Sequence, residues 1–174
     1  MTDLRAPDLA EAARVAVGLV GLTATTAVAV RLTAATEARE LLGFTFRGLP
    51  HRPSESVAIF VNNVRVLGAI LAACGIVQLA WGSLTRVAVG ICDVALLVGS
   101  VLQIVLIGTA FGAYGRRVLE TVFAHAPFEL LAFSLGLGLY LEARRTRLSM
   151  QRVVTVTASA TTALAIGAVV EVFA

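Results

Sequence analysis

Hydrophobic and polar positions alternate along the chain in long blocks, without the period of two that marks a half-buried strand. Five predominantly apolar runs are separated by short polar segments, and a hydrocarbon core of about 30 Å needs roughly 17–25 such residues per helix. We therefore predict an all-α polytopic transmembrane helix bundle that forms a single integral membrane domain. The predicted spans cover residues 15–31, 60–84, 87–111, 121–142 and 153–173.

The first run, residues 15–31, is the weakest of the five spans because it is rich in Ala, Thr and Gly. A cleaved signal peptide is the competing interpretation, since Arg5 precedes the apolar run and small residues follow it. We favour a retained span, because the run is long for the apolar region of a signal peptide.

The longest polar segment, residues 32–56, separates the first two spans. Within it, ATEARELLGFTFRGL predicts a short amphipathic helix at the membrane interface, with an apolar side formed by Leu41, Leu42, Phe44 and Phe46. The two prolines that follow, Pro50 and Pro53, end this helix before the second span begins.

The composition supports a surface that faces lipid. Hydrophobic residues make up 58% of the chain and charged residues only 14%, against about 25% in soluble domains. All basic residues are Arg, and they are scattered between the apolar runs, so we predict no nucleic-acid site. Cys74 and Cys92 lie inside apolar runs and are interpreted as free buried thiols.

The distribution of Arg residues predicts an orientation in a bacterial cytoplasmic membrane. The loop after the fourth span carries Arg144, Arg145, Arg147 and Arg152, and the positive-inside rule places it in the cytoplasm. Five spans then put the N-terminus in the cytoplasm as well. The first loop favours the opposite orientation, since it contains Arg31, Arg39, Arg47 and Arg52.

Small residues recur at helical spacing in two spans. One stripe in the second span repeats every seven residues, at Gly68, Gly75 and Gly82. The third span ends in a GxxxG pair formed by Gly108 and Gly112. Such positions let another helix approach closely in lipid, so we predict helix contacts at both.

The candidate chemistry centres on the fourth span, where His125 and Glu129 are four residues apart and share one helical face. An ionisable group at the bilayer centre costs roughly 2.5–3.5 kcal/mol and is therefore expected to have partners. The five-span topology brings other polar side chains to the same membrane depth. We predict one polar cluster, in which Arg65 pairs with an acid, formed by Asn62, Asn63, Arg65, His125, Glu129 and Glu171.

This cluster has three interpretations. Polar groups that fix the helix bundle are the favoured one, followed by a binding site for a peptide, a lipid head group or an ion. A catalytic centre with His125 and Glu129 as base and orienting partner is the third, and it lacks an adjacent nucleophile. HxxxE supplies two ligands where a catalytic zinc needs three, so we expect neither a metal nor a cofactor. Asp93, alone in the third run, is interpreted as a packing or interfacial residue.

Three segments carry a resemblance to a known family. FVNN at residues 60–63, HAPFELLAFSLGLGLYLEA at residues 125–143 and AVVEVF at residues 168–173 resemble the stage II sporulation protein M family. The resemblance implies five spans, and it implies that the family's polar positions correspond to Asn62 or Asn63, His125, Glu129 and Glu171.

The resemblance also implies two roles. The name-giving members are scaffolds for cell-wall hydrolases during engulfment, and short members are accessory proteins for making, exporting or resisting circular bacteriocins. We therefore expect a non-catalytic scaffold or accessory subunit rather than an enzyme. Its expected partners are the lipid bilayer, other membrane proteins, an ABC-type ATPase, a small hydrophobic peptide, a cell-wall hydrolase or a second copy. The alternative is an intramembrane enzyme or conductor that uses His125, Glu129, Asn62 and Glu171.

Overall fold

Five helices of the protein are long and apolar enough to cross a membrane, as the hydrophobic pattern predicts. The computed structural model describes residues 6–44, 52–79 and 85–173, which form seven helices and no strand. They are α1 (Ala6–Thr33), α2 (Ala35–Leu42), α3 (Pro53–Leu79), α4 (Thr85–Tyr114), α5 (Arg116–Val122), α6 (Ala126–Ala143) and α7 (Met150–Phe173). The five candidate spans fall within α1, α3, α4, α6 and α7, so the prediction of an all-α membrane helix bundle is confirmed.

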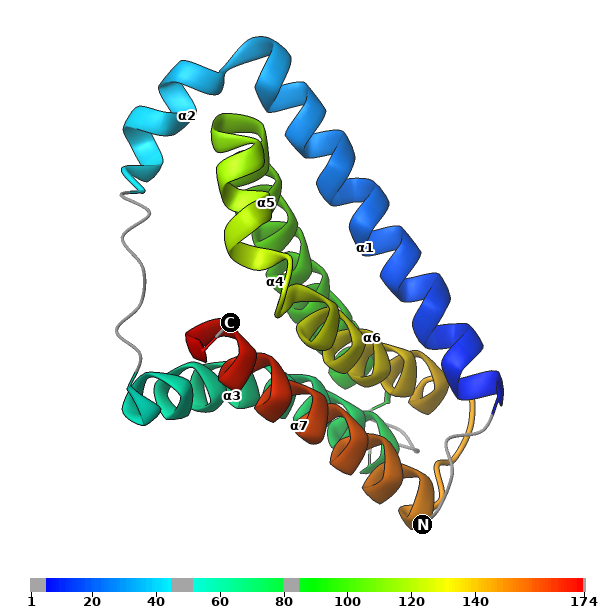
Figure 1. Cartoon of the computed structure of the whole chain (residues 1–174). Helices are drawn as coiled ribbons and strands as arrows, with labels where there is room; N and C mark the ends of the chain where they lie inside the picture. The colour runs from blue at the N-terminus through cyan, green and yellow to red at the C-terminus, as the bar shows by residue number, and fades with distance from the viewer. Residues whose placement is uncertain (1–5, 45–51, 80–84, 174) are drawn as a thin grey trace.

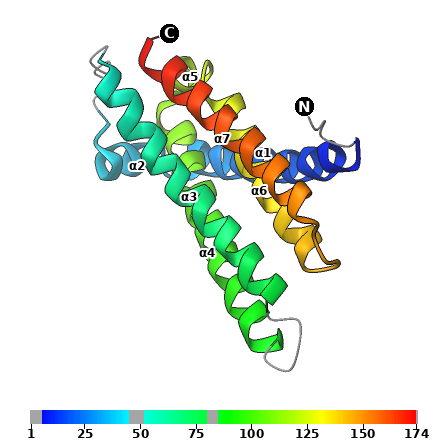
Figure 2. The same cartoon turned by 90° about the horizontal axis from the view of Figure 1, so that it is seen from below.

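Helix α6 is the centre of the bundle, because it packs against α1, α3 and α7 (Figure 1). Its buried side includes small residues such as Ala132, Ser134, Gly136 and Gly138, which allow neighbouring helices to approach closely. Seen from below, α3 lies beside α4 and α6 lies beside α7 (Figure 2). Helix α1 covers the opposite side and packs mainly on α4 and α6.

The two sets of glycines have different positions. A Cβ atom on Gly108 would lie 2.6 Å from Thr26 Cβ, and one on Gly112 would lie 2.6 Å from the Ala27 carbonyl oxygen. The GxxxG pair therefore lies in the contact between α4 and α1. Gly68 and Gly75 have nothing within 4 Å of such a Cβ atom, so no helix of the described chain covers them, while Gly82 lies outside the described residues.

The predicted fourth span, residues 121–142, is not one helix. Helix α5 ends at Val122, a turn follows, and α6 begins at Ala126. Pro127 explains the break: its ring would clash with the carbonyl of Phe123 in a continuous helix, whereas the first turn of a new helix tolerates proline.

The predicted helix between the first two spans is present but short. Helix α2 ends at Leu42 because Gly43 adopts a left-handed conformation with φ 58°, and residues 45–49 of the predicted helix, Phe46 among them, lie outside the described residues. Phe44 stacks on Tyr114 with ring centroids 5.6 Å apart, which attaches this connection to α4. Arg39 strengthens the attachment by donating a 2.6 Å hydrogen bond to the Ala113 carbonyl.

Polar contacts also tie the bundle together at the end where α6 leads into α7. Tyr140 donates a 2.7 Å hydrogen bond to Asp93, whose other carboxylate oxygen lies 3.2 Å from the Arg144 guanidinium. Asp93 thus joins α4 to the end of α6, in agreement with its interpretation as a packing residue. Cys74 and Cys92 are both free and buried, as predicted.

Candidate functional site

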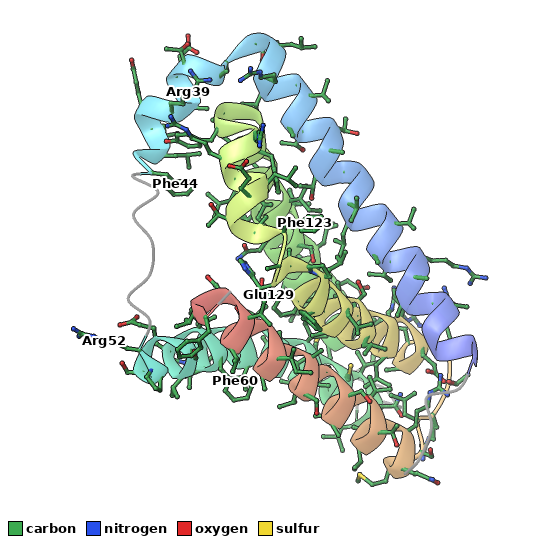
Figure 3. The ribbon with its side chains drawn as sticks, in the orientation of Figure 1. Arg39, Phe44, Arg52, Phe60, Phe123 and Glu129 are labelled. Atoms are coloured by element: carbon green, nitrogen blue, oxygen red, sulfur yellow. The ribbon has the colours of Figure 1, made fainter. Side chains whose placement is uncertain are left out.

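Three ionisable side chains meet where α6 begins and α7 ends. Each of His125, Glu129 and Glu171 offers one ligand atom, and these three atoms all lie within 4.8 Å of one another. His125 Nε2 is 4.0 Å from Glu171 Oε2. Glu129 lies at the start of α6, next to the C-terminal end of α7 (Figure 3). We call His125, Glu129, Glu171 and the neighbouring Asn63 the polar cluster.

The start of α6 positions His125 and Glu129. His125 is the N-cap residue, and its carbonyl accepts hydrogen bonds from the backbone N–H groups of Phe128 at 3.0 Å and Glu129 at 3.4 Å. Glu129 lies in the first turn, where the positive end of the helix dipole favours an acidic side chain. The break at Pro127 thus creates a helix terminus beside the polar cluster.

Gly167 lets α7 approach this helix start. A Cβ atom at Gly167 would lie 3.3 Å from Phe128 Cβ and 3.6 Å from Glu129 Cγ, so a larger residue would push α7 away. Glu171 follows four residues later, on the same face of α7. The close approach at Gly167 therefore brings Glu171 to His125.

Asn63 connects α3 to the polar cluster by donating a 2.5 Å hydrogen bond to Glu129 Oε1. The neighbouring Asn62 and Arg65 are exposed, and neither makes a hydrogen bond or ion pair with the cluster in the described part of the chain. The predicted pairing of Arg65 with Glu129 or Glu171 is therefore wrong. Two residues turn a helix by about 200°, so Arg65 faces away when Asn63 faces α6.

The polar cluster combines a buried imidazole with two half-buried carboxylates. His125 is only 6% exposed, and its buried Nδ1 has no hydrogen-bond partner. Such a donor set can hold a proton or a cation. The expectation that no metal binds counted only the two ligands of HxxxE, and Glu171 supplies a third from a different helix.

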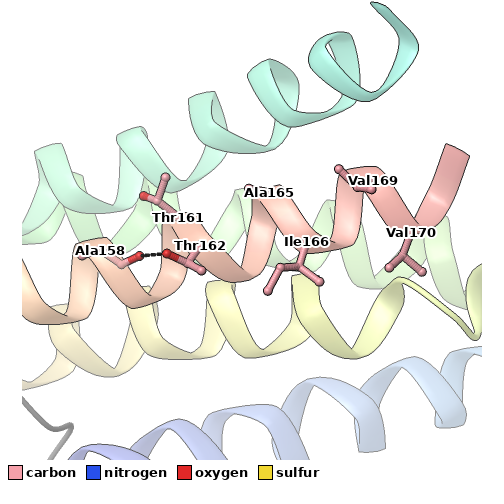
Figure 4. A pocket seen from close by; sticks show the side chains of 7 residues that line it. All are labelled: Ala158, Thr161, Thr162, Ala165, Ile166, Val169 and Val170. Carbon is pink, nitrogen blue, oxygen red and sulfur yellow. Dashed lines mark hydrogen bonds between the residues drawn. The ribbon is translucent and has the colours of Figure 1, made fainter. Parts of the chain in front are cut away.

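An open hollow lies elsewhere, on one face of α7 between Ala158 and Val170 (Figure 4). Its walls are almost entirely apolar, and the hydroxyl of Thr162 already donates a 2.9 Å hydrogen bond to the Ala158 carbonyl. A face of this kind suits lipid acyl chains, which have no polar groups that need hydrogen-bond partners. No residue of the polar cluster lines it.

Comparison of the chain with protein-family models, with curated proteins and with solved structures finds no match in any of the three.

Proposed function

We propose that this protein is a non-catalytic multipass membrane component, a scaffold or accessory subunit that acts by binding other membrane proteins. The observation that carries the proposal is the outward face of α3. Exposed residues recur along it at spacings of three and four, which keeps them on one side of the helix. This α3 face consists of Val61, Arg65, Gly68, Ala72, Gly75 and Leu79.

The exposed charge of Arg65 inside a membrane-spanning helix is the first indication of a partner. It lies well inside α3, roughly 18 Å from Pro53 at 1.5 Å per residue, and its side chain is exposed. An exposed Arg within the hydrocarbon is costly, by up to roughly 2.5–3.5 kcal/mol at the bilayer centre. In the described residues no acid forms an ion pair with it, so a polar or acidic group on another membrane protein would remove this cost.

The small residues beside Arg65 are the second argument. Gly68 and Gly75 have open space around them, and Ala72 lies between them on the same face. In lipid, helix association depends on close backbone packing because the hydrophobic effect gives no net drive between helices. The α3 face thus offers both a packing surface and a charge that needs a partner.

The resemblance to the stage II sporulation protein M family supports the same role. We propose that the partner is a cell-wall hydrolase complex, or a circular-bacteriocin apparatus with an ABC-type ATPase and a small hydrophobic peptide. A second copy of the chain is the other candidate for the same face. We place the protein in the bacterial cytoplasmic membrane with its N-terminus in the cytoplasm, because Arg144, Arg145 and Arg147 lie together between α6 and α7.

A photo-reactive amino acid introduced at Ala72 tests the proposal. We expect it to form a covalent adduct with another membrane protein in native membranes, and we expect Arg65→Leu to reduce this adduct several-fold. Val98 on α4, which is 51% exposed, is the matched control position and should give no discrete adduct. Co-expression of two differently tagged copies separates self-association from a different partner. Equal labelling at both positions, unaffected by Arg65→Leu, would contradict the proposal.

An intramembrane enzyme or conductor is the second candidate, and the convergence of His125, Glu129 and Glu171 favours it. If Glu129 acts directly, Glu129→Gln should abolish the cellular activity that depends on the protein while the amount of folded protein in the membrane stays constant. If the cluster is structural, the same change should lower that amount, because Asn63 and His125 lose a charged partner. Quantitative blotting of membranes beside the activity assay distinguishes the two.

A further inference from the structure

We propose that His125, Glu129 and Glu171 bind a divalent transition-metal ion, for which Zn²⁺ is the probe. The inference goes beyond the scaffold role and does not depend on it, since a metal at this position is compatible with either candidate function. It rests on the geometry of the three ligands, on the buried imidazole, on the local charge and on the hydrogen bond from Asn63.

The ligand geometry is close to what a metal requires. In a tetrahedral zinc site with bonds of about 2.0–2.1 Å, neighbouring ligand atoms lie roughly 3.3–3.5 Å apart. The three ligand atoms here lie within 4.8 Å of one another, and the distance from His125 Nε2 to Glu171 Oε2 is already 4.0 Å. Small rotations of two glutamate side chains would close the remaining gap. The fourth coordination position stays open for water or for a group on a partner.

The buried imidazole is an independent observation that points to a ligand. His125 is 6% exposed, and its Nδ1 has no hydrogen-bond partner. Nε2, the ring nitrogen that faces Glu171, lies 4.0 Å from its carboxylate, so neither ring nitrogen makes a hydrogen bond within the described residues. A buried polar atom without a partner costs roughly 1–3 kcal/mol. A metal held beside the two carboxylates would bind Nε2, while Nδ1 would keep the proton of the neutral imidazole.

The charge of the site also calls for a cation. Glu129 and Glu171 place two carboxylates together, and within the described residues neither forms an ion pair with an Arg. Like charges at this separation oppose each other's ionisation unless a cation lies between them. An imidazole with carboxylates suits zinc, iron or manganese, whereas magnesium and calcium prefer oxygen ligands alone.

Asn63 completes the arrangement as an orienting residue. Its amide donates to Glu129 Oε1, which leaves Glu129 Oε2 available to the metal. Hydrogen bonds of this kind to a ligating carboxylate fix its direction, and their loss typically weakens metal binding by about 10–100-fold. Helices α3, α6 and α7 would all be joined through the ion.

The test uses the full chain, purified in detergent with an affinity tag that contains no histidine, and stripped of metal with a chelator. After incubation with ZnCl₂ and desalting, elemental analysis is expected to find about one zinc per chain. Glu171→Gln should weaken zinc binding by on the order of tenfold or more, because it replaces a charged ligand with a weakly binding neutral amide, and losing even an outer-shell partner typically costs about 10–100-fold. Glu120→Gln is the matched control: this acid pairs with Arg116 on α5, outside the cluster, and the change should leave zinc binding as in the wild type.

Two outcomes of the zinc assay would overturn the proposal. One is a wild-type chain that retains no zinc, and the other is a Glu171→Gln chain that binds as tightly as Glu120→Gln, which would assign the zinc to other residues. If Glu171→Gln does not fold, Glu171→Asp keeps the charge and moves the ligand by one methylene.

The wild-type chain also provides a measurement that needs no variant. The visible spectrum of bound Co²⁺ should indicate nitrogen and oxygen ligands, and thiolate absorption would place the metal at Cys74 or Cys92 instead.

Discussion

Replacing Gly112 with leucine is expected to separate α1 from α4 and to destabilise the purified chain by about 1–3 kcal/mol or more. The physical reason is the contact itself. A Cβ atom at Gly112 would lie 2.6 Å from the Ala27 carbonyl oxygen and 2.7 Å from Val30 Cβ. A backbone oxygen cannot rotate away as a flexible side chain can, so α1 has to move as a whole.

Gly68→Leu is the matched control for this change. Both glycines lie within membrane-spanning helices, but an added Cβ atom at Gly68 has nothing within 4 Å. In a purified chain without partners, Gly68→Leu should change the free energy of unfolding by no more than about 0.5 kcal/mol. Unfolding in mixed detergent micelles, followed by circular dichroism, measures both variants. A similar loss for the two would show that α1 does not rest on α4 at Gly112.

The two glycine sets show that a sequence pattern predicts where close helix packing is possible but not where it occurs. Each gave the same local signal, a small residue at a spacing that permits close helix packing. A small residue at this spacing indicates that another helix can pack there, but it does not identify that helix. Gly108 and Gly112 are covered by α1, whereas Gly68 and Gly75 face outward. That difference depends on how α3 and α4 are rotated, which long-range packing decides.

The number of long apolar helices and their approximate positions could be predicted, because they depend on local hydropathy. Their ends could not: α3 begins at Pro53 rather than at residue 60, and residues 121–142 are divided between α5 and α6. The topology also placed His125 and Glu171 at the same side of the membrane, where they lie 4.0 Å apart. Pro127 lies at the start of α6, and the helix break could have been predicted from its missing N–H group. The long apolar run around it instead predicted one continuous helix. Gly167 gave no signal of its own until Phe128 and Glu129 were seen beside it.

The composition of the polar cluster was predicted only in part, and simple helix geometry explains the rest. Asn63 and Arg65 are two residues apart, so a helix turns them to faces about 200° apart. Asn63 and Arg65 therefore cannot both reach Glu129. Membrane depth alone places the two residues together, because depth does not depend on rotation about the helix axis. In the structure, Asn63 donates a hydrogen bond to Glu129, and Arg65 lies on the α3 face.

Replacing Asn63 with leucine is accordingly expected to cost about 1.5–3 kcal/mol of unfolding free energy, the range for hydrogen bonds to charged groups. Ordinary hydrogen bonds between membrane helices average only about 0.6 kcal/mol, so an effect of this size requires the carboxylate of Glu129 as the acceptor. Asn62→Leu is the control one position away. Asn62 is exposed, and its replacement should stay within about 0.5 kcal/mol of the wild type in the same micelle assay.

A double-mutant cycle then separates the hydrogen bond from general damage to α3. Asn63→Leu leaves the Glu129 carboxylate without its amide donor, and lipid offers no water to replace it. Removing both partners, as in Asn63→Leu with Glu129→Leu, eliminates that unpaired group, so the double variant should cost clearly less than the sum of the two single variants. Additive losses would mean that the two side chains do not interact. The rotation of α3 that joins Asn63 to Glu129 and turns Arg65 outward would then be wrong, and the partner proposed for the α3 face would lose its main support.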